Sequence, residues 1–229
     1  MKYLGIVVAT TAEATSLPKH PLVSGRVLLQ ISGIGAKRAH LAARTLLEKG
    51  ATSLLSWGSA CGLIPGLSPG SLVLPKKIIG VDGSVYSVDS AWHETLRTQL
   101  KGKVNLHEES LAERTTLMTS PAQKATLSQQ TGAIVVDMES AAVAAVAQKV
   151  PVPFLAIRAV VDPVDMTLPQ SALAALDEFG KLRPFGLLKA CAKNPMELFA
   201  WVRLARNFRE ARSTLVKVAR LAGSSLFVP

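Results

Sequence analysis

Three acidic residues stand where apolar sequence stops, and carboxylates are what proton transfer or the binding of sugar hydroxyls requires. Asp137 and Glu139 separate the short apolar run 133–136 from a segment made almost entirely of Ala and Val. Asp162, followed by Pro163, ends a longer apolar run. Carboxylates seldom lie beside core sequence unless a partner compensates their charge. A carboxylic acid held in a crevice can have a raised pKa and donate a proton near neutral pH.

Each of these acids also has a structural alternative. Acids in the first turn of a helix interact favourably with its dipole, so helix capping would suffice for Asp137. Capping does not require both acids, and Glu139 at the ligand edge of a sheet could accept hydrogen bonds from two adjacent hydroxyls, as on a ribose. For Asp162 the alternative is an Asp-Pro turn, with Arg158 paired to a neighbouring acid. Both interpretations of each acid stay open at this point.

The segment Gly33-Ile-Gly35-Ala-Lys-Arg38 follows a predicted strand and opens a predicted helix. Glycines let the backbone approach a ligand closely, and a helix N-terminus favours an anion. A dinucleotide fingerprint would need a third glycine where Arg38 stands, and it would normally occupy the first strand-to-helix turn rather than the second. The pattern therefore argues against an NAD site. A phosphate or ribose contact and a tight turn without a ligand both remain open.

The segment Trp57-Gly-Ser59-Ala-Cys-Gly62 leaves another predicted strand. It does not match the nucleophile elbow of a serine hydrolase, because Trp57 takes the place of the first glycine and no His is positioned for a triad. Small residues at a strand end suit a flat ring or a sugar that lies against the backbone, and a packed turn is the alternative.

The elements that would position these residues alternate between strands and helices. Short apolar runs predict strands at 3–8, 26–31, 52–57, 71–74, 104–106, 134–136 and 154–160, and periodic patterns predict helices at 36–49, 92–100, 121–130, 138–149 and 171–179. This alternation implies a largely parallel sheet covered on both faces. Residues 61–86, rich in Gly, Pro and Ser, interrupt the rhythm and contain short strands that could run antiparallel. We therefore predict an α/β fold with a central mixed β-sheet flanked by helices.

Composition narrows the class of protein further. The 229 residues, 48% of them hydrophobic, are enough for one large domain or a domain with an appendage. No run of eighteen apolar residues occurs, and the start MKYLGIVVAT is interpreted as a strand rather than a signal peptide. Cys61 and Cys191 are 130 positions apart, which fits a reduced cytoplasmic protein without a disulfide.

The net charge of +10 is concentrated in the C-terminal tail. Residues 181–229 contain ten Lys or Arg and two Glu, whereas residues 1–180 have a net charge of only +2. This asymmetry argues against nucleic acid as a partner of the main domain. Residues 196–221 predict a basic amphipathic helix, which could lie on an anionic membrane or pack against the domain or a second subunit. Its apolar stripe comprises Trp201, Leu204, Phe208, Leu215 and Val218, and its basic stripe Arg203, Arg206, Lys217 and Arg220.

Together the motifs resemble the purine nucleoside phosphorylase and methylthioadenosine/adenosylhomocysteine nucleosidase superfamily. The resemblance runs in order over residues 1–165, and Asp-Met-Glu followed by Arg-Ala-x-x-Asp is specific as a pair. It implies a three-layer nucleoside phosphorylase-like fold. The matching elements are Glu13 after the first strand, Ser32-Gly-Ile-Gly35, Trp57-Gly-Ser-Ala-Cys-Gly62, Pro69-Gly-Ser-Leu-Val73, Val136-Asp-Met-Glu139-Ser-Ala-Ala142 and Pro153-Phe-Leu-Ala-Ile-Arg158-Ala-Val-Val-Asp162.

One branch looks most similar, the hopanoid-associated phosphorylases, which remove adenine from adenosylhopane. The similarity lies in Asp162-Pro-Val-Asp165, in Leu168-Pro169 and in the basic helical tail. Glycosidases of methylthioadenosine typically carry Ser before the acid, where this chain has Val161, and they lack this tail. The resemblance thus implies release of adenine in hopanoid biosynthesis. A methylthioadenosine/adenosylhomocysteine nucleosidase is the alternative, and a non-catalytic nucleoside-binding protein is the alternative from another class.

The resemblance also implies a role for each acid. Asp162 would protonate N7 of the purine, and Glu139 would bind the ribose hydroxyls and stabilise positive charge on the sugar. Val136 and Met138 would line the base and sugar pocket with their backbone. Glu13 corresponds to the acid that activates water in hydrolytic members. An acid at the leaving group and negative charge near the sugar are what an oxocarbenium-like transition state needs.

Further expectations concern phosphate, partners and boundaries. Ser59, with Gly35 and Arg38, would contact substrate or phosphate in phosphorolytic members, so inorganic phosphate is a possible co-substrate, and whether water or phosphate attacks stays open. No metal or other cofactor is expected. The resemblance implies a homo-oligomer, with the phosphorylase-like domain at 1–182 and a helical extension at 183–229. Peripheral membrane contact through 195–222, at the inner surface, is the remaining expectation for a cytoplasmic protein.

Overall fold

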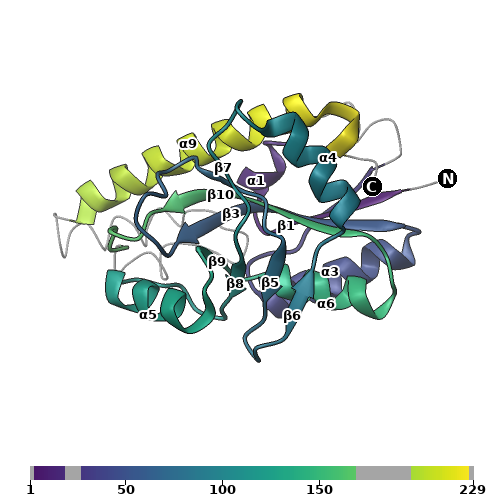
Figure 1. The fold of residues 1–229 in the computed structure, drawn as a ribbon, viewed down its shortest axis with the longest axis horizontal. Coiled ribbons are helices and arrows are strands. Elements are labelled where there is room, and N and C mark those ends of the chain that lie inside the picture. Colours follow the sequence, from purple (N-terminus) through teal and green to yellow (C-terminus); the bar gives the residue numbers. More distant parts are fainter. Residues whose placement is uncertain (1–2, 19–26, 169–196, 227–229) are drawn as a thin grey trace.

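The computed structural model describes residues 3–18, 27–168 and 197–226. These residues form a mixed β-sheet of ten strands with helices on both faces (Figure 1). This arrangement is the layered α/β architecture that the sequence predicts. The strands are β1 (Leu4–Val8), β2 (Val27–Ile31), β3 (Ser53–Gly62), β4 (Leu72–Val73), β5 (Lys77–Ile79), β6 (Val85–Ser87), β7 (Leu106–His107), β8 (Leu111–Glu113), β9 (Val135–Asp137) and β10 (Phe154–Asp162).

The strand β3 is the centre of the sheet, because it has partners along both sides. On one side β10 pairs with it in parallel, from Phe154 opposite Leu54 to Asp162 opposite Cys61. On the other side its first half pairs in parallel with β1, and its last two residues pair antiparallel with β9. The carboxyl ends of the parallel strands β1, β3 and β10 therefore lie at one edge of the sheet, where ligand sites of α/β sheets form.

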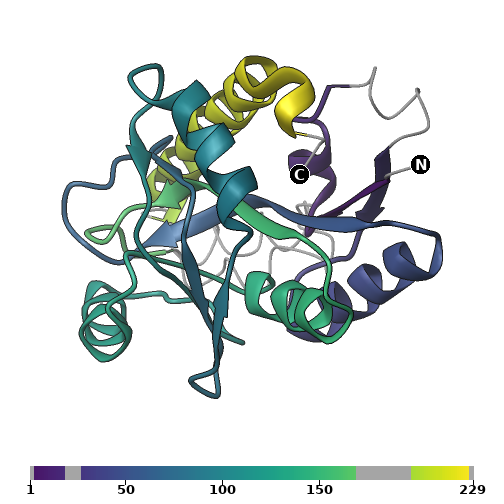
Figure 2. The same ribbon diagram turned by 45° about the vertical axis from the view of Figure 1, so that its right-hand side comes forward.

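Helices cover the two faces of the sheet in pairs. Figure 2 shows α4 and α9 above the sheet and α3 and α6 below it. Successive residues of a strand point to opposite faces of the sheet. In β10, Ala156 and Val160 therefore belong to the core between the sheet and the helices α3 and α6. Ile157 and Val161 belong to the core between the sheet and the helices α4 and α9. The helices are α1 (Thr11–Ala14), α3 (Ala36–Glu48), α4 (Ser90–Leu100), α5 (Pro121–Thr131), α6 (Ser140–Lys149), α9 (Glu197–Ala222) and the 3₁₀ helix η1 (Gly223–Leu226).

The basic C-terminal helix α9 is part of the main core. Leu215 and Val218 are 2% and 0% exposed and pack in the same cluster as Ile157 of β10. Trp201 and Leu204 are also buried, whereas Phe208, at 36%, is exposed. Most of the apolar stripe therefore packs against the sheet and α4. Of the two alternatives for this helix, membrane contact and packing, the structure shows packing against the domain. The division between 182 and 183 falls outside the described residues.

The predicted elements mostly match the structure. The predicted strands and helices within the described residues are all present, but β3 continues to Gly62 and α6 begins at Ser140 rather than 138. The short elements α1 and β8 were missing from the prediction because three or four residues carry little periodicity. The antiparallel pair of β5 and β6 matches the short strands expected at 61–86. The helix predicted at 171–179 lies outside the described residues. No helix in the described part of the chain is long and apolar enough to cross a membrane.

Candidate functional site

Glu13 is held at the carboxyl end of β1 by four hydrogen bonds. It belongs to α1, where Thr10 and Glu13 form a capping box, and its Oε2 accepts from the N–H groups of Ala9 and Thr10 at 3.1 and 3.0 Å. Its Oε1 accepts from both the N–H and the hydroxyl of Ser59 on β3, each at 2.8 Å. The capping box fixes the backbone of Glu13, and Ser59 then fixes the direction of its carboxylate.

Gly58 is required for this contact. A Cβ atom at position 58 would lie 2.5 Å from Oε1 of Glu13, closer than a side-chain carbon can approach an oxygen. The glycine of the Trp-Gly-Ser segment therefore makes room for a carboxylate of the same chain. The small residues of this segment predicted a close approach to a ligand, but nothing in the sequence indicated that Glu13 is the group that approaches.

Glu139 is held by the glycine turn before α3. Its Oε1 accepts a hydrogen bond of 2.8 Å from the N–H of Gly35, which has a φ of +108° that favours glycine. The anion at the N-terminus of α3 is thus a carboxylate of the chain itself. This contact joins residues 104 positions apart, and it brings together two segments that the sequence analysis had treated as separate motifs.

Asp137 has the structural role that was one of its two predicted alternatives. Its Oδ1 accepts from the N–H of Ser140 at 3.1 Å, at the start of α6, and its Oδ2 is 2.7 Å from Nε of Arg158. Arg158 also donates to the hydroxyl of Ser56 at 2.7 Å. Both ionic groups are buried, so the arginine compensates the charge of the aspartate. Asp137 therefore accepts the first N–H of α6, whose N-cap residue is Glu139, and fixes the turn that carries Glu139.

The environment of Glu139 favours its protonated form. Burial is the largest cause, and the negative charge of Asp137 adds to it; together they raise the pKa of Glu139 to about 8 in spite of Arg158 and the N–H of Gly35. The charge of Glu13 acts in the same direction. A positive charge placed beside these carboxyl groups would favour their ionised forms and be stabilised by them.

Asp162 ends β10 at an irregularity in the strand. The pairing of β10 with β3 shifts between Val160 and Asp162, so that Val161 is skipped and Asp162 lies opposite Cys61. Such bulges redirect side chains and are frequent beside active sites. Burial raises the pKa of Asp162, and the ammonium group of Lys124, whose Nζ is 2.9 Å from Oδ2, opposes this effect. Asp162 therefore has an environment that suits a proton donor.

The last residues of β3 connect the three acids Glu13, Glu139 and Asp162. Ser59 binds Glu13, and Cys61, two residues later, lies opposite Asp162 on one side and opposite Val136 of β9 on the other. Of the predicted site residues, Glu13, Ser59, Gly35, Glu139 and Asp162 thus come together at this edge, with Val136 and Met138 leading into Glu139. Arg38 lies in the first turn of α3, exposed, with its Nη1 3.4 Å from the carbonyl of Ile34.

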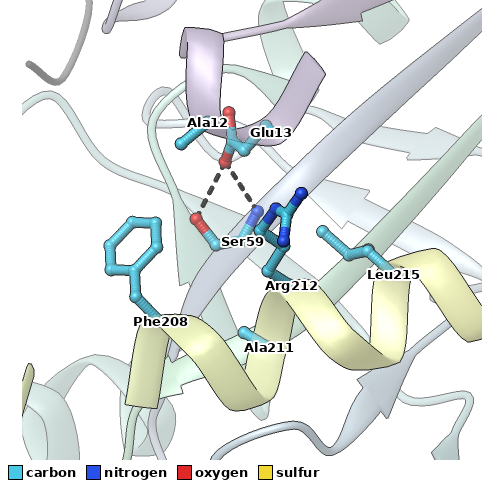
Figure 3. Close-up of a pocket in the computed structure, with 7 residues that line it drawn as sticks. All are labelled: Ala12, Glu13, Ser59, Phe208, Ala211, Arg212 and Leu215. Atoms are coloured by element: carbon cyan, nitrogen blue, oxygen red, sulfur yellow. Dashed lines mark hydrogen bonds between the residues drawn. The ribbon is translucent and has the colours of Figure 1, made fainter. Parts of the chain in front are cut away.

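The helix α9 also reaches this edge, which the sequence analysis did not anticipate. Figure 3 shows Phe208, Arg212 and Leu215 of α9 facing Glu13 and Ser59. Arg212 donates a hydrogen bond of 3.2 Å from Nε to the hydroxyl of Thr15, just beyond α1. The partly open cavity between them has a volume of about 10 Å³, which is about the space of one water molecule. The helix α9 therefore contributes both to the hydrophobic core and to the lining of the cavity at Glu13.

The hydrogen-bond donors in this site are directed at carboxylates of the chain itself. Within the described ranges, no group of three or more His, Cys, Asp or Glu side chains could hold a metal ion. The N–H and hydroxyl of Ser59 and the N–H of Gly35, which could contact phosphate, donate to Glu13 and Glu139. Two carboxylates thus occupy the positions where an anion would have to bind.

Fold and site together define an α/β protein with acids and backbone donors gathered at the carboxyl edge of its sheet. A model of the phosphorylase superfamily matches residues 19–182 of the sequence. The chain belongs to this superfamily and is a glycosidic-bond-cleaving enzyme. No protein with curated annotation matches it by sequence.

Solved structures show the same fold over nearly the full chain. Futalosine hydrolase of Helicobacter pylori superposes with a TM-score of 0.73 at 17% identity, covering 96% of each chain. The 5′-methylthioadenosine/S-adenosylhomocysteine nucleosidase of Neisseria meningitidis, in complex with methylthio-immucillin-A, gives 0.72 at 19% identity and covers 98% of this chain and 100% of that one. The S-adenosylhomocysteine nucleosidase of Streptococcus pyogenes, in complex with 5-methylthiotubericidin, gives 0.73 at 16% identity, covering 100% and 98%.

Proposed function

We propose that the protein hydrolyses the N-glycosidic bond of a 5′-substituted adenosine and releases adenine. The observation that carries this proposal is the position of Glu13, which Ser59 and the capping box orient at the edge shared with Glu139 and Asp162. A fixed carboxylate beside the sugar and a protonated acid beside the base are the two groups that this reaction needs.

The proposed reaction assigns one proton transfer to each end of the scissile bond. Asp162 donates its proton to N7 of adenine as the bond between C1′ and N9 breaks, and the bonding electron pair leaves with the base. A water molecule forms the new bond to C1′ and gives its proton to Glu13. Glu139 accepts hydrogen bonds from the ribose hydroxyls. The positive charge that develops on the sugar favours the ionised form of Glu139, which in turn stabilises the oxocarbenium-like sugar. Adenine and a 5′-substituted ribose are the products.

The site favours water over phosphate as the nucleophile. Phosphate beside Ser59 would be placed next to the carboxylate of Glu13, and the repulsion of the two anions would oppose its binding. The cavity of about 10 Å³ beside Glu13 has room for water. A nucleoside is far larger, so we expect the exposed side chains of Phe208 and Arg212 to move when substrate binds.

The finer proposal for the substrate is adenosylhopane, and hence a place in hopanoid biosynthesis, because the sequence resembles the hopanoid-associated branch. Phe208 and Leu215 add apolar surface to the site lining, which suits a lipophilic 5′ group. The alternative is methylthioadenosine or adenosylhomocysteine, which is supported by the similar folds of the nucleosidases that were solved with nucleoside analogues. Both substrates would use the same three acids.

Adenine release with and without inorganic phosphate tests this proposal directly. Purified protein is given adenosylhopane, or an adenosine with an alkyl chain at the 5′ position, and in parallel methylthioadenosine. We expect release without phosphate, faster from the lipophilic substrate, and incorporation of labelled oxygen from water at C1′. Release that requires phosphate would overturn hydrolysis, and release from methylthioadenosine alone would overturn the lipophilic substrate. No adenine from any of these nucleosides would overturn the proposed function.

Two proposals about assembly accompany this function. The first is a homo-oligomer, which sedimentation velocity would detect. The second is peripheral contact of 195–222 with the inner membrane surface. Since the apolar stripe of α9 packs in the core, the contact would use its solvent side, where Leu198, Phe199 and Val202 are exposed ahead of Arg206 and Arg209.

A further inference from the structure

Lys124 of α5 is a lysine without exposure to solvent, and the proposed reaction does not use it. Its side chain is 0% exposed, and its Nζ lies 2.9 Å from Oδ2 of Asp162. The same nitrogen donates to the carbonyl oxygens of Pro163 and Met166 at 2.8 and 2.7 Å. The ammonium group therefore donates to two carbonyl groups just after β10 and forms an ion pair with the acid that ends this strand.

Burying an ammonium group is costly, and good acceptors only partly offset the lost hydration. The surroundings of Lys124 offer an apolar alternative, because Leu127 on the same helix packs into a cluster with Leu63 and Ala133. An apolar side chain at 124 would fit such a cluster without this cost. A buried lysine that reaches a single acid is therefore better explained by what it does to Asp162 than by the stability of α5.

Two properties of Asp162 depend on this contact. The first is direction, because Asp162 follows a bulge in β10, where strand pairing alone no longer fixes the side chain. The second is charge, because a positive group at hydrogen-bond distance favours the carboxylate and counteracts burial. Among the described residues, Lys124 forms the only ion pair with Asp162, and without it this 4% exposed carboxylate would keep only the smaller effects of Cys61 and Arg203.

We propose that Lys124 is a positioning residue for the reaction, which holds the Asp162 carboxyl group at the end of β10 and sets the pH range in which Asp162 carries the proton for the leaving base. The inference rests on the proposed function, since it takes Asp162 to be the proton donor. It adds a residue from a helix that contributes no other group to the site.

The first test does not depend on activity. Infrared difference titration follows the protonated carboxyl of Asp162, which is identified by its absence in Asp162→Asn. We expect Lys124→Met to move its midpoint upward by about one pH unit or more, and Lys124→Arg, which keeps the positive charge, to move it less. Lys101→Met, at an exposed lysine, is the matched control and should not move it. An unchanged midpoint in folded Lys124→Met overturns the proposal.

If Lys124→Met does not fold, the double variant Lys124→Met/Asp162→Asn tests whether the lysine serves Asp162. A charge pair predicts that removing the second charge restores folding, because the single variant leaves a buried carboxylate uncompensated. A double variant that is no more stable than Lys124→Met would show that the lysine does not serve Asp162, and the proposal would be overturned.

The second test follows adenine release against pH. A proton donor must be protonated, so kcat falls as pH rises through the pKa of Asp162. We expect this alkaline limb to move to higher pH by about one unit in Lys124→Met and to stay near the wild-type position in Lys124→Arg. Active Lys124→Met with the wild-type limb overturns this inference alone. A wild-type protein that releases no adenine overturns the proposed function, and the catalytic role of Lys124 with it.

Discussion

Glu13 and Ser59 are joined by two hydrogen bonds to a single carboxylate oxygen, one from the backbone N–H and one from the hydroxyl, both at 2.8 Å. The residues are 46 positions apart, one after β1 and the other within β3. In the proposed reaction this pair lies on the side of the nucleophile, because it aims a carboxylate at the cavity beside α9 and uses donors that could otherwise bind phosphate.

The role of Glu13 as the base can be tested with Glu13→Gln. Glutamine keeps only one of the two acceptor oxygens, so it can accept from Ser59 or from the N–H groups of Ala9 and Thr10 but not from both, and we expect the thermal midpoint to fall while the protein still folds. Glutamine cannot take a proton from water, so kcat for adenine release should fall by about 10²–10⁴-fold. Glu48→Gln, at an exposed end of α3, is the control and should behave as wild type. A Glu13→Gln enzyme with near-normal kcat would contradict this role.

Asp162→Asn separates chemistry from binding. The amide cannot supply the proton for N7, so we expect kcat to fall by about 10²-fold or more, while affinity for a non-hydrolysable nucleoside analogue changes by less than about tenfold. Kinetics and calorimetry measure the two effects. The matched control is Asp165→Asn, because Asp165 is exposed and makes only a surface pair with Arg203 at 3.3 Å. Equal losses in both variants would argue against a specific role for Asp162.

Glu139 predicts a pH dependence of stability. Its pKa is raised from 4.5 to about 8 in the folded protein, so between these values the folded state holds a proton that the unfolded state has lost. The contribution of Glu139 to the free energy of unfolding should therefore decrease as pH rises from about 4.5 to 8, by an amount on the order of a few kcal/mol. In Glu139→Gln this decrease should be smaller, as measured by urea unfolding at several pH values. Parallel curves for the two proteins would disprove the shift.

The packing of α9 predicts a contrast between two leucines on one helix. Leu215 is 2% exposed, and Leu215→Ala should lower the free energy of unfolding by about 2–5 kcal/mol. Leu198 is 52% exposed, and Leu198→Ala should change it by less than about 0.5 kcal/mol. Denaturant unfolding measures both. Equal effects would mean that α9 does not pack against the domain in solution.

The same packing changes how membrane contact must be tested. Deleting the tail would expose the core, so the informative variant is Arg206→Ala/Arg209→Ala on the solvent side of α9. Each basic residue near an anionic surface contributes about 1 kcal/mol, so the pair should weaken co-sedimentation with anionic liposomes about 30-fold. Neutral liposomes are the control. Binding that is unaffected by the double variant would remove α9 from any membrane contact.

The sequence was sufficient for the longer strands and helices. The apolar runs of β1, β3 and β10 and the periodicity of α3 and α9 are local properties, and each appears at its predicted position. The difference in role between Asp137 and Glu139 could also be predicted in part. Capping is a local interaction, and Asp137 does bind the N–H of Ser140 at the start of α6.

Contacts between distant segments could be decided only by the tertiary structure. Nothing near Lys124 in the sequence indicates that its ammonium group reaches Asp162, because that contact depends on where α5 packs relative to the end of β10. The same holds for Gly35 and Glu139, and for α9, whose side chains line the cavity at Glu13. Sequence periodicity specifies which face of an element is apolar, but not which element it meets. Sheet register and helix packing bring those partners together.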